Sequence, residues 1–221
     1  MIARARGCVV PVAVRRLLVV LVALCGVACW LPAASLAQLS WSRPAAIDEN
    51  GQHSLSGVAC PSAAQCTAFD FSGQQVTFDP ASPGTPTPTA LDANGLDGVA
   101  CPSATQCTAV DFIGQQVTFD PASPGTPTPT SVDPGHVLIG VACPTAAQCT
   151  AFDNNGQQVT FDPASPGTHI PTTIDTSNSL TGVACPSATQ CTAIDSGGQQ
   201  VTFDPASPGT PTPPRSTPAT S

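Results

Sequence analysis

Eight cysteines that recur in four evenly spaced pairs carry the most evident chemistry in this chain. The sequence has 11 cysteines, three of which lie before residue 38. The others lie six residues apart, as Cys60 and Cys66, Cys101 and Cys107, Cys143 and Cys149, and Cys185 and Cys191. The strict repetition of this spacing favours a disulfide within each pair. Zinc sites need closer cysteines with further ligands, and thioredoxin-like sites need C-x-x-C. We therefore predict structural disulfides and an oxidising compartment.

An Asp-x-x-Gly tetrapeptide follows each cysteine pair, and its aspartates are Asp70, Asp111, Asp153 and Asp195. Such residues could bind calcium or a sugar hydroxyl, but their ordinary role is to cap a turn whose glycine takes positive φ. A calcium loop needs several closely spaced oxygen ligands, and the two residues between Asp and Gly differ in every copy. We predict turn-capping aspartates and no metal or other cofactor, with calcium as the disfavoured alternative, strongest beside Asn154 and Asn155.

A Gln-Gln pair follows each of these turns. One amide of each pair points away from the core face of its strand, and the residues concerned are Gln75, Gln116, Gln158 and Gln200. Four identical amides could bind a glycan by avidity. The favoured interpretation is that near-identity reflects recent duplication and that the amides pair between repeats.

Three histidines, His53, His136 and His169, occur once each, outside any repeating position. None has a fixed Ser or Cys partner, so we predict no catalytic triad and no catalytic residue.

These motifs belong to one unit that occurs four times. The copies begin at Gly57, Gly98, Gly140 and Gly182. A tandem period near 40 residues is typical of propeller blades. Pro and Gly divide the first copy into expected strands at 55–60, 66–70 and 74–79, with a loop at 61–65. Small residues dominate the first strand, as crowding at a propeller axis requires.

The last segment of each copy is rich in proline. Pro86 and Pro88 are two residues apart, a spacing that an edge strand tolerates because its alternate N–H groups face away from the sheet. We predict a fourth strand over 85–92.

The two ends of the array are complementary. Residues 41–48 match a fourth segment, since Asp48 follows an apolar residue as Asp92 does, whereas the last copy lacks this ending. We expect the N-terminal segment, anchored by Trp41, to complete the last blade and 210–221 to form a disordered tail.

The G-V-A-C-P-S-x-x-Q-C-T-A-x-D-x-x-G unit resembles the blade repeat of secreted, chiefly actinobacterial, β-propeller-like repeat proteins over nearly all of 55–208. The resemblance implies an all-β fold, a four-bladed β-propeller of four-stranded antiparallel blades within 38–209. We expect the blades near 54–95, 96–137, 138–179, and 180–209 with 41–48.

The D-x-x-G hairpin is also similar to the Asp-box turn of sialidase-type propellers, although that turn has one residue between Asp and Gly and an aromatic soon after. Nothing catalytic carries over, because the chain has no tyrosine and no arginine cluster.

Three other architectures compete with the closed ring. A β-trefoil has threefold symmetry, which four copies do not fit. Four disulfide-closed hairpins could instead be separated by solvated, glycosylated Pro/Thr segments. Two chains could also share an eight-bladed ring.

The N-terminal residues 1–37 have the order of a secretory signal peptide: a basic leader, an apolar run at 17–31 and a small-x-small site ending at Ala37. A lipid anchor or a twin-arginine signal fits less well. We expect cleavage after Ala37 and secretion, with no membrane span in the mature chain.

The remaining residues, 38–221, contain two arginines and all 14 carboxylates, a formal charge of −12. Such a surface repels nucleic acid and anionic membranes. We expect a secreted, non-catalytic binding or scaffold module for an extracellular glycan, cell-envelope polymer or protein. The alternative is a sialidase-like glycoside hydrolase or lyase, which odd residues concentrated at the axis would favour.

Overall fold

The structure is a computed structural model of the chain that describes residues 43–48 and 54–209. The predicted signal peptide at 1–37, Trp41, His53 and the predicted tail at 210–221 lie outside these residues. All four repeats belong to one compact unit, Ala45–Ser221.

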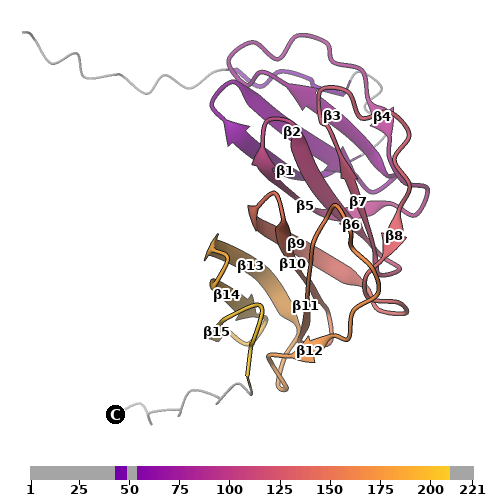
Figure 1. The fold of residues 1–221 in the computed structure, drawn as a ribbon. Helices are drawn as coiled ribbons and strands as arrows, with labels where there is room; N and C mark the ends of the chain where they lie inside the picture. The colour runs from indigo at the N-terminus through magenta and orange to yellow at the C-terminus, as the bar shows by residue number, and fades with distance from the viewer. Residues whose placement is uncertain (1–42, 49–53, 210–221) are drawn as a thin grey trace, which may run out of the picture. The chain divides into compact units, whose positions relative to one another are not determined.

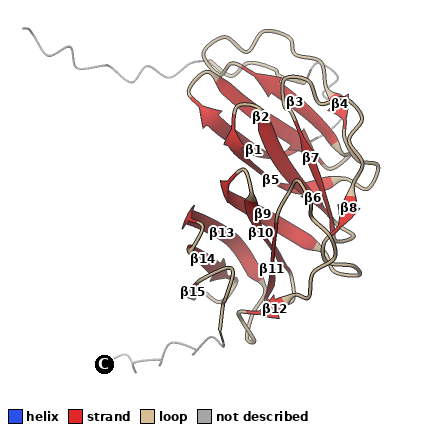
Figure 2. Ribbon diagram, viewed as in Figure 1, coloured by secondary structure: helices blue, strands red, loops and turns tan. Residues whose placement is uncertain are grey.

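Every repeat folds into short antiparallel strands (Figures 1 and 2). The first repeat forms β1 (Leu55–Ser62), β2 (Gln65–Asp70), β3 (Gln74–Phe78) and β4 (Thr89–Ala90). The second forms β5 (Leu96–Ser103), β6 (Gln106–Asp111), β7 (Gln115–Phe119) and β8 (Thr130–Ser131). The third forms β9 (Leu138–Thr145), β10 (Gln148–Asp153), β11 (Gln157–Phe161) and β12 (Thr172–Thr173). The fourth forms β13 (Leu180–Ser187), β14 (Gln190–Asp195) and β15 (Gln200–Phe203).

Each repeat is one sheet whose strands follow chain order, as in β1-β2-β3-β4. Three sheets have four strands and the last has three. The expected all-β class is therefore confirmed. No helix of the described residues has the length and apolar character needed to cross a membrane.

The first strand of each repeat is longer than predicted. β1 continues through Pro61 to Ser62, so the expected end at Pro61 and the five-residue loop are wrong. β1 lies at the edge of its sheet, and its pairing with β2 is irregular between Ala59 and Ser62. A proline without an N–H is tolerated there because no regular ladder bond is lost.

The fourth strand is shorter than predicted. Only Thr89 and Ala90 pair with β3, and the prolines precede them. The next two N–H groups, of Leu91 and Asp92, both donate to the carbonyl of Gly73, at 2.8 and 3.2 Å. The predicted span of 85–92 was wrong because the prolines have no N–H to give the ladder.

The repeated glycine of the first strand permits close approach of neighbouring groups. A Cβ added to Gly98 would lie 2.7 Å from the Cα of Gly140 in the next repeat. A Cβ on Gly57 would lie 2.5 Å from the ring of Phe69. The predicted crowding of the first strands is therefore present.

Hydrophobic clusters join each repeat to the next. Phe69 and Leu91 pack with Leu96 and Val117, Val110 packs with Leu138 and Val159, and Phe152 packs with Leu180 and Phe203. Because each buried cluster takes side chains from two neighbouring repeats, the repeats are not hairpins separated by solvated linkers, and that alternative is excluded for residues 54–209.

The last sheet is incomplete. Residues 43–48 form no strand, and within the described part of the chain no fourth strand lies beside β15. Among the described residues, the four sheets are not closed into a ring by the pairing that the sequence predicted. Leu55, Val58 and Ile194, at the two ends of the array, are accordingly 43, 59 and 52% exposed.

Candidate functional site

A disulfide closes the first hairpin of every repeat. The bonds join Cys60 to Cys66, Cys101 to Cys107, Cys143 to Cys149 and Cys185 to Cys191, as the spacing predicted. A bridge over so short a loop restricts the unfolded chain by roughly 2 kcal/mol. Four such bridges are typical of extracellular proteins.

The turn aspartates use one carboxylate oxygen to cap their own hairpin. Oδ1 of Asp153 accepts hydrogen bonds from the N–H groups of Asn155 (2.9 Å) and Gln157 (2.8 Å). In the other repeats, the N–H of the Gln four residues later donates in the same way to Asp70, Asp111 and Asp195, at 2.9, 2.6 and 2.5 Å. The turn glycines adopt positive φ, as at Gly156 (79°). Oδ1 is thus committed to the turn, and Oδ2 remains for other partners.

A second aspartate, from the end of the preceding repeat, lies beside the turn aspartate. The pairs are Asp92 with Asp111, Asp133 with Asp153, and Asp175 with Asp195. We call them the Asp111, Asp153 and Asp195 junctions. Neighbouring carboxylates disfavour a second negative charge, so a third side chain decides how each pair is satisfied.

At the Asp111 junction the third side chain serves only one aspartate. Asn94 donates to Oδ1 of Asp92 through its N–H (2.8 Å) and its amide nitrogen (3.1 Å). Oδ2 of Asp111 is buried without a partner. Burial raises the pKa of Asp111, and Asp92 raises it further, against hydrogen bonds from the N–H groups of Gln115 and Ile113. This junction favours an added proton.

At the Asp195 junction an amide satisfies the turn aspartate. Nδ2 of Asn178 donates to Oδ2 of Asp195 at 2.7 Å. The hydrogen bond from the Gln199 N–H, helped by Asn178 and Asp175, holds the pKa of Asp195 below its ordinary value. Both oxygens of Asp195 therefore accept a hydrogen bond while the carboxylate stays ionised.

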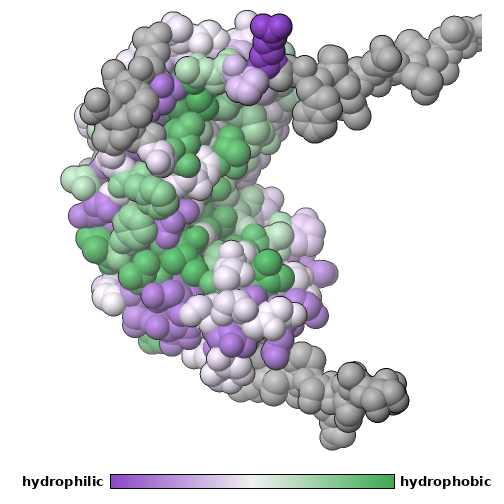
Figure 3. All heavy atoms as spheres, turned by 180° about the vertical axis from the view of Figure 1, so that it is seen from behind, coloured by the Kyte–Doolittle hydropathy of each residue, from purple (hydrophilic) through white to green (hydrophobic). Residues whose placement is uncertain are grey.

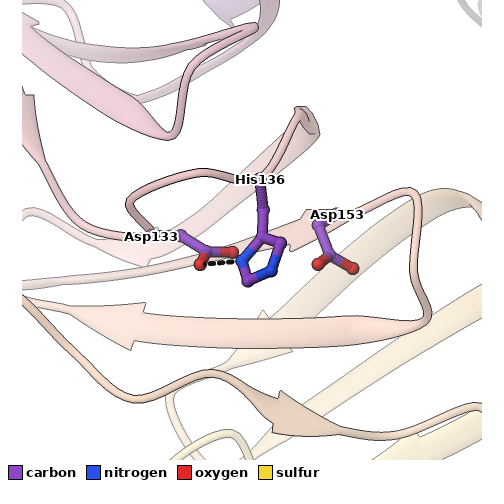
Figure 4. Close-up of side chains that lie close together, drawn as sticks. All are labelled: Asp133, His136 and Asp153. Carbon is purple, nitrogen blue, oxygen red and sulfur yellow. Dashed lines mark hydrogen bonds and ion pairs between the residues drawn. The ribbon is translucent and has the colours of Figure 1, made fainter.

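At the Asp153 junction a histidine takes the third place. His136 lies between the carboxylates of Asp133 and Asp153 (Figure 4). Its Nδ1 is 2.6 Å from Oδ1 of Asp133, and this hydrogen bond raises the pKa of His136. Asp153 is fully buried, and its Oδ2 has no hydrogen-bond partner among the described residues. One imidazole nitrogen and two carboxylate oxygens here lie within 4.8 Å of one another, a set of donors able to hold a metal ion.

The glutamines named in the sequence analysis are largely withdrawn from the surface. Gln75, Gln116 and Gln158 are only 3–4% exposed. Oε1 of Gln75 accepts a hydrogen bond from the hydroxyl of Thr77 at 2.9 Å, and the same bond recurs in the other repeats. These amides are thus bonded within their own repeat. Gln200 is exposed, and no other strand of the described residues pairs with β15 on that side.

A different glutamine ties the repeats together, and sequence reasoning missed it. Nε2 of Gln65 donates to the carbonyl of Ala104 in the next repeat at 2.8 Å. Gln106 and Gln148 each donate the equivalent hydrogen bond to a backbone carbonyl of the repeat that follows their own. The feature of the sequence that could have predicted this bond is the Gln that precedes the second cysteine in every copy.

An open depression of about 220 Å³ is lined by all four repeats. The Gly-Val dipeptides of β1, β5, β9 and β13 form most of its wall, with Phe69 and Phe152. The position before the glycine differs between copies and contributes Asp97, Ile139 and Thr181. Burial raises the pKa of Asp97. Hydrophobic side chains also gather over one face of the described residues (Figure 3).

No protein-family model matches the sequence, and none of the curated proteins matches it. The function must therefore be argued from the residues that line the depression and the junctions.

Proposed function

We propose that this chain is a secreted, non-catalytic binding module that closes into a four-bladed β-propeller and binds an extracellular polymer at its depression. The observation that carries the proposal is that one depression takes residues from all four repeats. The position before the repeated glycine differs between the repeats and places Asp97, Ile139 and Thr181 there. Disulfides and the signal-like sequence at 1–37 support secretion.

Closure is supported by matching surfaces at the two ends of the array. Phe69 packs with Leu96, Val110 with Leu138 and Phe152 with Leu180 at the three internal interfaces. The residues left at the ends are Ile194 and Leu55, which occupy the same two positions and are exposed. Joining them makes a fourth equivalent interface and brings Gln190 to the first hairpin. The segment that precedes the first repeat then supplies the fourth strand beside β15.

A neutral polysaccharide is the ligand class that the depression suits best. Residues 38–221 carry a formal charge of −12, which disfavours anionic polymers. Asp97 and Thr181 offer an acceptor and a hydroxyl beside apolar Val and Phe groups, a combination that suits sugar hydroxyls and C–H faces. Glycoside hydrolysis ordinarily needs two carboxyl groups, and Asp97 is the one carboxyl among the residues that line the depression. Binding is therefore favoured over hydrolysis.

The test uses a panel of insoluble neutral polysaccharides and cell-wall preparations in pull-down assays with the oxidised, full-length chain. We expect binding to at least one polymer, and Asp97→Asn and Thr181→Ala to weaken it at least fivefold. Asp204→Asn is the matched control, because it removes the same charge at an exposed turn.

The outcomes separate the hypotheses clearly. Absence of binding to every polymer, or equal affinity for the Asp97→Asn variant, would overturn the proposal. Release of reducing sugar ends by the wild type, abolished in Asp97→Asn, would establish the hydrolase alternative instead.

A further inference from the structure

The Asp153 junction contains a buried oxygen that has no hydrogen-bond partner within residues 43–48 and 54–209. Asp153 is 0% exposed, and while its Oδ1 accepts two turn N–H groups, its Oδ2 accepts none. A buried carboxylate oxygen without a donor is unfavourable. A proton or a cation bound at Oδ2 of Asp153 would remove this cost.

The groups around that oxygen are metal ligands. Figure 4 shows His136 between the carboxylates of Asp153 and Asp133, and Asp133 is only 2% exposed. One nitrogen and two oxygens lie within 4.8 Å of one another. The His136 side chain is 38% exposed, so the ring can adjust and an ion can enter from solvent.

The neighbouring junctions lack this combination. The Asp195 junction has Asn178, whose amide already satisfies Oδ2 of Asp195. The Asp111 junction has Asn94, which bonds only to Asp92. An amide nitrogen is not a metal ligand, whereas an imidazole nitrogen is. Among the side chains beside these aspartates, His136 alone has a nitrogen with metal-binding chemistry.

We infer that Asp133, His136 and Asp153 bind a divalent transition-metal ion, with Zn²⁺ the best match. One imidazole and two carboxylates suit Zn²⁺, which accepts three protein ligands and keeps a fourth position for water. Ca²⁺ requires six or more oxygen ligands, which this junction does not supply. The ion ties the end of the second repeat to the turn of the third, and its binding does not depend on what the depression holds.

The test is titration calorimetry with ZnCl₂ on the untagged, oxidised, full-length chain after chelator treatment. We expect one Zn²⁺ per chain, an affinity at least tenfold lower for His136→Asn, and no change for the control His169→Asn. The His136→Asn substitution installs the side chain that the Asp195 junction already uses, so the fold should tolerate it. Zn²⁺ should raise the thermal midpoint of the wild type and not that of His136→Asn.

A gain of binding keeps the test decisive even if His136→Asn is poorly folded. Asn178→His places an imidazole beside Asp175 and Asp195, and we expect two Zn²⁺ per chain in this variant. No Zn²⁺ binding by the wild type, or equal binding by wild type and a folded His136→Asn, would overturn the proposal.

Discussion

The Asp153 and Asp195 junctions share the capped Asp-x-x-Gly turn and differ in the side chain that lies beside the turn aspartate. At both, Oδ1 of the turn aspartate accepts the N–H of the Gln four residues later. His136 lies beside Asp153, and Asn178 lies beside Asp195. The amide satisfies its carboxylate directly, whereas the histidine leaves an oxygen of Asp153 unpartnered. The turn is therefore a constant scaffold, and the residue three positions after the preceding aspartate determines the chemistry.

The same two regions also differ in packing. Phe152, next to Asp153, is 2% exposed and packs against the fourth repeat. Ile194, next to Asp195, is 52% exposed at the end of the array. A repeat thus acquires part of its core from its neighbour, so the last copy is stable only as far as the others support it.

The largest predicted effect is on the packing beside Asp153. Phe152→Ala should lower the free energy of unfolding by about 3–5 kcal/mol, since it empties a buried site between two repeats. Chemical denaturation of the oxidised protein measures this. Ile170→Ala is the control, since Ile170 is 92% exposed and should change stability by less than about 0.5 kcal/mol. A loss below about 1 kcal/mol for Phe152→Ala would show that the two repeats do not share a core.

Removing the turn cap should come second. Asp153→Ala leaves two N–H groups of a half-buried turn without an acceptor and should cost about 2–3 kcal/mol. Asp195→Ala should cost less, because water reaches the turn beside the exposed strand β15. Denaturation of both variants gives the comparison, and equal losses would contradict it.

The ties between hairpins should contribute less. Gln148→Ala removes the 2.8 Å hydrogen bond to the carbonyl of Ala188 and should cost about 1 kcal/mol. In a closed ring, Gln190→Ala should cost a similar amount, because Gln190 then reaches the hairpin of the first repeat. If Gln148→Ala lowers the free energy of unfolding and Gln190→Ala does not change it, the array is open.

The smallest effect concerns pH. The pKa of Asp195 is lower in the folded state, so this group stabilises the fold above its unfolded pKa, and that stability is lost as the pH falls through the folded pKa. The pKa of Asp111 is raised in the folded state, so this group removes stability as the pH rises from its unfolded pKa to its folded pKa. Thermal midpoints between pH 6 and pH 3 should therefore fall less steeply for Asp195→Asn than for wild type, and more steeply for Asp111→Asn. Parallel profiles for all three proteins would contradict this assignment.

Local features could be predicted from the sequence because they depend on residues close in the chain. The spacing of Cys60 and Cys66 specified the disulfide, and the Asp70 motif specified a turn with glycine at positive φ. The lengths of the edge strands could not be predicted, because Pro61 is tolerated only through an irregular pairing that depends on the partner strand.

Contacts between repeats were not accessible in the same way. His136 lies outside the repeat pattern, and nothing near it in the sequence indicates that Asp153, 17 positions on, lies close to it. The sequence predicts that Gln75 pairs between repeats, whereas its Oε1 accepts a hydrogen bond from Thr77 of its own repeat. Identical sequences conceal which of two amides faces a neighbour, and only the packed sheets decide.

A double-mutant cycle between Leu55 and Ile194 tests the closed ring most directly. The internal pair Phe152 and Leu180 supplies the positive control, since both lie in one cluster. Closure predicts that the losses in unfolding free energy from Leu55→Ala and Ile194→Ala are coupled by about 1 kcal/mol, as expected for residues in contact. Losses that add to within about 0.4 kcal/mol, while the control pair is coupled, would show that the first and last repeats do not meet.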